Sequence, residues 1–346
     1  MTDRLRALVE LGGPAGLVLA TALLGALVSR TLEIYFINAL IAVVIVVALY
    51  TFIGTSGVLS FGHISFVAIG AWTAGVLSVP QEEKPALMPS LFGFLRDTTV
   101  GNVPSLVLAA AVGGAFALVV GLPLMRLSGL AAGIATFAVL EITNNVLRYW
   151  EKIGPGLTTF SSVPETTGIL QAAVGALLAI AVAFAYQRSR FGRQLRAARE
   201  DPAAARAVGI SIYRQRLGAF VLSGLLAGFA GGLYVHFLPI NADVVYLDLT
   251  FVTLAMLVIG GATSLWGAVV GALAVSALDS VLANAENGID VLGQTIDLRA
   301  GTRIVVVSAL MALVLLLRPG GLTGGRELSL PRVRGGQSVA EAEAEA

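Results

Sequence analysis

The sequence is dominated by long apolar runs, each close to the length at which an α-helix crosses a lipid bilayer. A hydrocarbon core about 30 Å thick is crossed by about 20 apolar residues in a helix. A segment in that core must satisfy its own backbone hydrogen bonds, so only helices or a closed barrel can span it. The runs are continuous rather than alternating, which excludes the strands of a barrel. The chain is therefore predicted to be an all-α, polytopic membrane protein.

Ten apolar segments are predicted to be membrane helices. The composition agrees with this, because 57% of the residues are hydrophobic and only 12% are charged. The first segment follows Arg4 and Arg6 and could instead be a signal peptide, but no convincing small-residue cleavage site follows it. The ten segments are 12–29, 34–53, 57–79, 104–125, 128–149, 168–187, 217–237, 247–260, 265–283 and 301–317.

Basic residues predict the orientation of the chain. Residues 188–216 carry eight arginines, and loops rich in Lys and Arg stay on the cytoplasmic side. Counting segments in both directions from this loop places both termini in the cytoplasm. Ten spans divide into two halves of five, and an odd number per half would give the second half inverted topology, a plan common among transporters. We expect a transmembrane domain over 1–323 and a disordered tail over 324–346, which ends in alternating Ala and Glu.

The cytoplasmic loop contains the signature of a very short helix. Asp201 is placed to cap it, Pro202 suits its first turn, and Gly209 suits its C-terminal end. Such a short helix is unstable alone in water, so it needs a partner surface. Its run of Ala side chains would let that surface approach closely. An arginine-rich loop that only sets topology, or that touches anionic lipid headgroups, explains the same residues.

This loop also carries a family resemblance. The stretch from Gly192-Arg193 through Gly209-Ile210 resembles the coupling segment of branched-chain amino acid ABC permeases of the LivM type. In that family the segment docks on a cytoplasmic ATPase and transmits its closure to the membrane helices. The likeness continues in Ala219-Phe220, Leu226-Ala227-Gly228, Ala230-Gly231-Gly232, Gly260-Gly261, Ser264-Leu265-Trp266-Gly267 and Arg318-Pro319-Gly320-Gly321-Leu322. The resemblance implies a coupling role for Arg199, Glu200, Asp201, Pro202, Ala204, Ala205 and Gly209.

A second family-like stretch runs over 54–66 and on to Trp72, where the family usually has tyrosine. Glycines and serines between two apolar runs weaken a helix, and a broken helix can present backbone groups and a dipole end to a polar solute. Close packing between helices explains the same small residues. The candidates for a substrate pathway here are Ser56, Gly57, Ser60, Gly62 and His63. His63 could carry a proton, but a neutral histidine can simply join helices by a hydrogen bond, as we also expect for His236.

The fifth apolar segment carries a polar stripe of Glu141, Asn144, Asn145 and Arg148, whose spacing places most of them on one helical face. A buried carboxylate in a membrane is costly unless it is paired, so this face should meet the bundle interior or a wet pathway. Glu141, where the family also tends to be acidic, and Asn145 are further pathway candidates. Residues 156–162 depart from the glycine-rich segment of the family, which leaves the substrate open.

The sequence lacks the residues that several classes of function require. There is no phosphate-loop motif around either lysine, Lys84 or Lys152, so the chain cannot itself be the ATPase. It has no cysteine and no metalloprotease or nucleophile-elbow motif, so we predict no catalytic residue, no metal site and no enzyme activity. A stand-alone carrier would need ion or proton sites, for which only His63, Glu141 and Asp279 are available.

The resemblance implies the permease subunit of an ATP-binding-cassette importer that carries leucine, isoleucine and valine across the bacterial inner membrane. This subunit would bind no cofactor, since ATP and Mg²⁺ are used by partner subunits. The implied partners are two cytoplasmic ABC ATPase subunits, a second homologous permease, a periplasmic or lipid-anchored substrate-binding protein and membrane lipid, but no nucleic acid. The alternatives are a stand-alone secondary carrier for a small polar solute, or an ABC permease for urea, other amino acids or sugars.

Overall fold

The computed structural model describes residues 2–286, 289–291, 294–296, 299, 301–318 and 320–328. Each of the ten predicted segments contains an apolar helix, and seven of these helices are long enough to cross a membrane. The multi-pass helical character is therefore confirmed, while the number of spans stays a prediction. The ten helices are α1 (Thr2–Leu27), α2 (Arg30–Ser56), α3 (His63–Ser78), α6 (Asn102–Leu124), α7 (Gly129–Tyr149), α8 (Ile169–Arg188), α11 (Ile212–Val235), α12 (Leu247–Gly260), α13 (Leu265–Glu286) and α14 (Thr302–Leu317).

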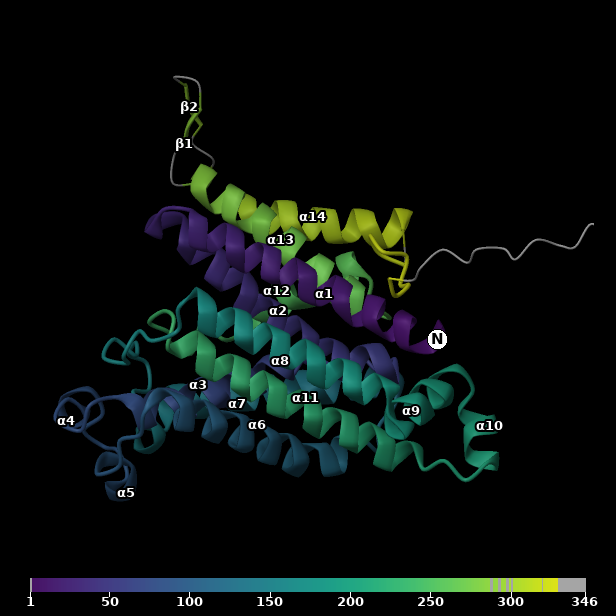
Figure 1. The fold of residues 1–346 in the computed structure, drawn as a ribbon. Helices are drawn as coiled ribbons and strands as arrows, with labels where there is room; N and C mark the ends of the chain where they lie inside the picture. The colour runs from purple at the N-terminus through teal and green to yellow at the C-terminus, as the bar shows by residue number, and fades with distance from the viewer. Residues whose placement is uncertain are drawn as a thin grey trace, which may run out of the picture.

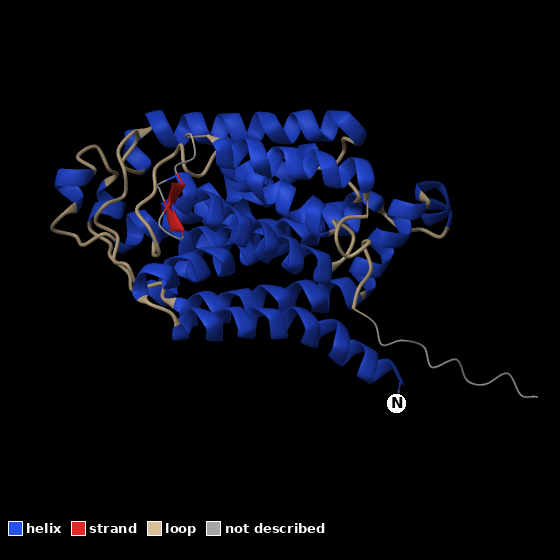
Figure 2. Cartoon of the chain, turned by 90° about the horizontal axis from the view of Figure 1, so that it is seen from above, coloured by secondary structure: helices blue, strands red, loops and turns tan. Residues whose placement is uncertain are grey.

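Short elements gather at the two ends of the helical body (Figure 1). The N-terminus, α9 (Arg190–Glu200) and α10 (Pro202–Ala207) lie at one end, which we call the arginine-rich end. The opposite end holds α4 (Lys84–Leu87), α5 (Gly93–Arg96), the 3₁₀-helix η1 (Glu151–Ile153) and an antiparallel hairpin of β1 (Ile289–Val291) and β2 (Gln294–Ile296). Figure 2 shows the loops divided between the same two ends. This division agrees with the predicted orientation, in which the N-terminus and the arginine-rich loop share one side.

The helices form two sets of five with matching packing. The first set is α1, α2, α3, α6 and α7, and the second is α8, α11, α12, α13 and α14. In each set the third helix is short, with 16 residues in α3 and 14 in α12. Helix α11 packs against α2, α3 and α6, while α2 packs against α11, α12 and α13. When the helices of the two sets are matched in chain order, α2 corresponds to α11, α3 to α12 and α6 to α13. The contacts of α11 with α3 and α6 then correspond to those of α2 with α12 and α13, which is the pattern that an inverted repeat produces.

Glycines allow the central helices to approach closely. A Cβ atom added at Gly70 of α3 would lie 2.1 Å from the carbonyl oxygen of Gly228 in α11. One added at Gly231 would lie 1.9 Å from the carbonyl oxygen of Val67. No larger residue fits at either position without moving a backbone. Small residues therefore bring α3 and α11 together, as they do in other membrane bundles.

The segment after α14 is held against the start of α13. The carboxylate of Glu327 accepts hydrogen bonds from the backbone N–H groups of Leu265, at 2.9 Å, and Trp266, at 3.1 Å. These N–H groups have no partner within their own helix, and a negative charge is favourable there. Residues 324–328, which fall within the expected disordered tail, thus make specific contacts. Residues 329–346, the rest of that tail, lie outside the described part of the chain.

Candidate functional site

Two non-helical connections enter the helical body from opposite ends and both reach α7. The first connection, residues 57–62, joins α2 to α3, and the second, residues 236–246, joins α11 to α12. The backbone N–H of Phe61 donates to Thr136 Oγ1 of α7 over 3.1 Å. Asn144 Nδ2 of α7 donates to the carbonyl oxygen of Ala242 over 2.9 Å. Because Thr136 and Asn144 are about two turns apart, both connections meet α7 near its middle.

The first connection begins where α2 is closed by a left-handed glycine. Gly57 has φ = 69°, a conformation that glycine adopts without strain. At its other end Gly62 packs on α7, since an added Cβ would lie 2.3 Å from the carbonyl oxygen of Thr136. Turn geometry and close packing therefore account for both glycines. The predicted helical segment 57–79 is corrected, because α3 begins only at His63.

Unpaired polar atoms surround the N-terminus of α3. The hydroxyls of Ser60 and Ser65 and Nδ1 of His63 are buried without hydrogen-bond partners among the described residues. The α3 N-terminus also lacks a side-chain cap, since Gly62 precedes it. Ser56, in contrast, accepts a hydrogen bond from the Val58 N–H over 3.2 Å. A helix N-terminus with free hydroxyls suits an anionic group such as a carboxylate, or ordered water.

Both histidines tie helices together. His63 Nε2 lies 2.6 Å from the hydroxyl of Ser223, midway along α11. That hydroxyl also bonds the carbonyl oxygen of Ala48 in α2, so His63 links three helices. If Ser223 donates to that carbonyl, Nε2 must donate to Ser223, which leaves Nδ1 as the free acceptor. His236 contacts Ser105 of α6 over 2.9 Å through Nε2, and its Nδ1 lies 3.0 Å from the Pro164 carbonyl oxygen.

The polar stripe of α7 divides between an interior and an exterior side. Asn144 is buried, whereas Glu141 and Asn145 are exposed on the outside of the chain. The Glu141 carboxylate accepts from Asn145 Nδ2 over 2.8 Å and from the hydroxyl of Tyr246 in the second connection. Within this chain, Glu141 and Asn145 therefore lie outside the bundle interior. A carboxylate exposed halfway along a membrane helix is costly in lipid, so this α7 face needs water or another chain beside it.

The short helix predicted in the arginine-rich loop is confirmed as α10. Asp201 Oδ1 accepts from the N–H groups of Ala203, at 2.9 Å, and Ala204, at 3.0 Å. Gly209 follows the helix with φ = 79°, the left-handed conformation expected of it. Ala204 and Val208 are exposed, and Val208 is 76% exposed. Ala205, in contrast, is 4% exposed and packs on this chain, so an outside partner would meet Ala204 and Val208 instead.

Arg199 joins this segment to the first connection. Its Nη1 donates to the carbonyl oxygen of Gly54 in the last turn of α2 over 2.8 Å. An added Cβ at Gly57 would lie 2.7 Å from Arg199 Cγ, so the arginine side chain crosses directly over this glycine. Arg199 also pairs with Glu200 at 2.8 Å. The motif singled out Arg199, but no sequence signal pointed to its partner 145 residues away.

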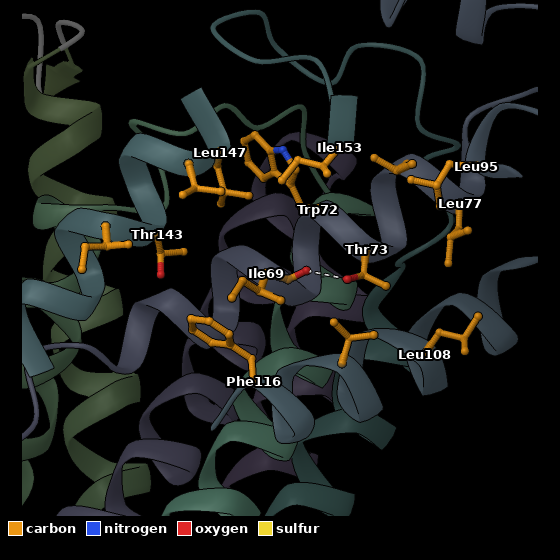
Figure 3. A pocket seen from close by; sticks show the side chains of 14 residues that line it. Ile69, Trp72, Thr73, Leu77, Leu95, Leu108, Phe116, Thr143, Leu147 and Ile153 are labelled. Carbon is orange, nitrogen blue, oxygen red and sulfur yellow. Dashed lines mark hydrogen bonds between the residues drawn. The ribbon is translucent and has the colours of Figure 1, made fainter. Parts of the chain in front are cut away.

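Sequence reasoning missed an apolar cavity of about 430 Å³ between α3, α6 and α7 (Figure 3). Trp72 and Ile69 of α3 face Thr143 and Leu147 of α7, with Phe116 of α6 beside them. The indole N–H of Trp72 and the hydroxyl of Thr143 have no hydrogen-bond partners among the described residues. The cavity walls suit an apolar group rather than a zwitterion. In the part of the chain that the structure describes, no cluster of three or more His, Cys, Asp or Glu could hold a metal.

Comparison with known proteins adds an independent finding. Residues 31–317 match the family model described as branched-chain amino acid transport system / permease component. The chain is 31% identical over 156 residues to the "Probable branched-chain amino acid transport permease protein LivH" of Methanocaldococcus jannaschii, covering 43% of this chain and 45% of the relative. It is 27% identical over 270 residues to the high-affinity branched-chain amino acid transport system permease protein LivM of Salmonella typhimurium, covering 68% and 59%.

The chain is also similar to a permease that is named for a different cargo, nucleosides. The chain is 27% identical over 220 residues to the nucleoside ABC transporter permease protein NupC of Lactococcus lactis, covering 60% of this chain and 66% of the relative. The matched regions thus span 45% to 66% of the length of these three relatives. No solved structure matches the chain significantly.

Proposed function

We propose that this chain, which belongs to the branched-chain amino acid transport system permease family, translocates branched-chain amino acids across the bacterial inner membrane. Proteins of this family are ABC permease subunits, so the energy would come from separate ATPase subunits. The observation that carries the proposal is the link from an exposed surface helix, α10, through Arg199 to the end of α2. Such a link gives a partner at the arginine-rich end a route into the membrane helices.

Coupling would begin at α10. Ala204 of α10 and Val208, the residue that follows the helix, are exposed and offer a small apolar surface to a cytoplasmic ATPase. ATP-driven closure of two ATPase subunits would shift α9 and α10, and Arg199 would carry the shift to Gly54 and the first connection. A partner changes the balance between two conformations only if it binds them with different affinity. The ATP-bound ATPase pair would supply that difference.

The substrate pathway would run along the α7 face. A second, related permease subunit covering this face would enclose Glu141 and Asn145 in a wet passage rather than in lipid. The carboxylate of Glu141 would attract the ammonium group of an amino acid in this passage. The relatives named LivH and LivM support amino acids of the branched-chain class as the cargo.

A nucleoside is the second candidate substrate, because the chain also resembles the permease NupC. A nucleoside carries no ammonium group, so a transport cycle for it would not depend on the charge of Glu141. Urea, other amino acids and sugars stay as further cargo alternatives, and a stand-alone carrier as a different transport class. The soluble binding protein would choose among similar cargoes.

The first test is to purify the tagged chain from its native host in mild detergent and to identify its companions by mass spectrometry. We expect two ATPase subunits, a second permease and ATP-dependent uptake of leucine by the reconstituted complex. Val208→Glu should abolish co-purification of the ATPase, while Arg193→Gln, at an exposed position of α9, should not. A chain that is isolated alone and transports in liposomes without ATP would overturn the proposal. ATP-dependent uptake of nucleosides but not leucine would establish the second candidate.

A further inference from the structure

A polar cavity of about 550 Å³ lies at the arginine-rich end between α8, α9 and α11. Arg190 and Arg214 line it, are exposed, and have no ion-pair partner among the described residues. The lining also includes Tyr186, whose hydroxyl is buried and has no hydrogen-bond partner in the described part of the chain. The described lining contains no carboxylate. Two guanidinium groups without ion-pair partners among the described residues therefore line a space that suits an anion.

An apolar groove of about 470 Å³ continues from this cavity along α11. The groove is walled by Leu118 of α6 and by Leu217, Val221 and Leu225 of α11. It shares three residues with the polar cavity, Arg214, Gly218 and Leu222. From Arg214 to Leu225 the helix rises about 16 Å, which takes the groove well into a bilayer. The cavity with its two arginines thus continues into an apolar groove that extends toward the membrane interior.

Gly218, at the junction, has no packing explanation within the chain. An added Cβ at Gly218 would meet nothing within 4 Å, although glycine inside a helix costs about 1 kcal/mol relative to alanine. The other glycines compared on this helix behave differently, because an added Cβ would lie 2.3 Å from Ala117 at Gly224 and 2.4 Å from Ala109 at Gly228. The surface at Gly218 is therefore open to a group from outside this chain.

We propose that the cavity and the groove form one site for an anionic phospholipid of the leaflet at the arginine-rich end. Its phosphate is held by Arg190 and Arg214, and one acyl chain lies in the groove against Gly218. Guanidinium groups match phosphate oxygens well, and basic pockets between membrane helices favour anionic headgroups. A soluble phosphate would bind the arginines of the cavity but would leave the apolar groove unfilled. The site depends only on the chain spanning a membrane, and not on its cargo.

The position of the site gives the lipid a consequence for the rest of the molecule. Residues 209–211, which line the cavity, come one residue after the end of α10. Gln215 and Gln194 of the same lining join α11 to α9 by a hydrogen bond of 2.7 Å. A lipid that fills the site therefore braces the junction of α9, α10 and α11 against the membrane.

The test compares lipid retention in the purified full-length protein after passage through nanodiscs of phosphatidylcholine with or without phosphatidylglycerol. Native mass spectrometry measures the phosphatidylglycerol that stays bound. Arg214→Gln should lower retention about fivefold, the value expected for one basic residue near an anionic surface. Gly218→Leu should lower it at least as much by filling the groove, and the open space around Gly218 leaves room for the leucine.

Matched controls separate a specific site from general effects of charge and volume. Arg193→Gln removes an exposed arginine of α9 outside the cavity, and Gly16→Leu adds a side chain at a helical glycine of α1 that also faces open space. Both controls should retain phosphatidylglycerol like the parent protein. Unchanged retention in Arg214→Gln and Gly218→Leu, or an equal loss in the controls, would overturn the proposal. So would displacement of the lipid by glycerol 3-phosphate at matched concentration, since the groove would then contribute nothing.

Discussion

Replacing Arg199 by glutamine tests whether α9 and α10 act on α2 through one side chain. The hydrogen bond from Arg199 Nη1 to the Gly54 carbonyl oxygen is 2.8 Å long, and the arginine is 27% exposed. Hydrogen bonds to charged groups contribute about 1.5–3 kcal/mol, and partial exposure favours the lower end. The ion pair with Glu200, which is 72% exposed, adds little. Arg199→Gln should therefore weaken the link between α9 and α2 by about 1–2 kcal/mol, a factor of about 5–30 in an equilibrium.

The assay is ATP-driven uptake by the reconstituted complex, measured together with ATP hydrolysis. We expect uptake per ATP hydrolysed to fall about 5–30-fold, while ATPase binding and hydrolysis persist because the surface of α10 is unchanged. Gly57→Ala should produce the same uncoupling with Arg199 intact, since its Cβ would lie 2.7 Å from Arg199 Cγ and its backbone has φ = 69°. Arg193→Gln, on the same helix, is the matched control.

Two results would refute this reasoning. Uptake per ATP equal to that of the parent protein would show that the contact with Gly54 carries no coupling. Parallel loss of uptake and hydrolysis would show instead that Arg199 is needed for assembly with the ATPase. Co-purification of the ATPase with the variant distinguishes these two outcomes.

The remaining predictions concern charge, packing and pH. Glu141→Gln should raise the KM for amino acid uptake about tenfold or more through loss of a charged hydrogen-bonding group; an unchanged KM would remove Glu141 from the pathway. Gly231→Ala should lower stability by about 1–3 kcal/mol because its Cβ would overlap the Val67 carbonyl, seen as a lower Tm, whereas Gly16→Ala should not. Burial raises the pKa of Glu327 although two N–H groups oppose this shift. Above the ordinary glutamate pKa, the folded chain therefore keeps a proton on Glu327 that the unfolded chain has lost. The contribution of this protonation to stability declines as the pH rises through that window. Glu327→Gln should remove that part of the pH dependence of Tm, and an identical profile would contradict it.

Features that depend on neighbouring residues could be predicted from the sequence. Apolar runs located the membrane helices, and the order of Asp201, Pro202 and Gly209 located α10, because caps and hydropathy are local properties. The start of α3 was missed because residues 58–61 include enough apolar side chains to extend the run back toward Gly57. The contacts of Glu327 could not be predicted, because it lies in a polar segment whose hydrogen bonds are with α13.

Contacts between distant segments could not be predicted in the same way. Ala205 and Ala204 are identical in chemistry, yet one packs inward and the other outward, which only the docking of α10 on its own chain decides. The exposure of Glu141 likewise depends on which side of α7 meets the rest of the bundle. The pairing of Arg199 with Gly54 joins residues 145 positions apart, and neither carries a local signal for the other.

The contacts of the two connections with α7 suit this helix to receive a movement that begins at the arginine-rich end. The first connection is held at one end by Arg199 crossing over Gly57, and at the other by the hydrogen bond from Phe61 to Thr136 of α7. A shift of α9 that pulled on the end of α2 would therefore displace a short segment whose far end rests on α7. The second connection is bonded to α7 through Tyr246, whose hydroxyl donates to the carboxylate of Glu141. Because packed side chains resist small continuous deformations, a displacement of α9 would be transmitted to α7. It would thereby change the position of Glu141.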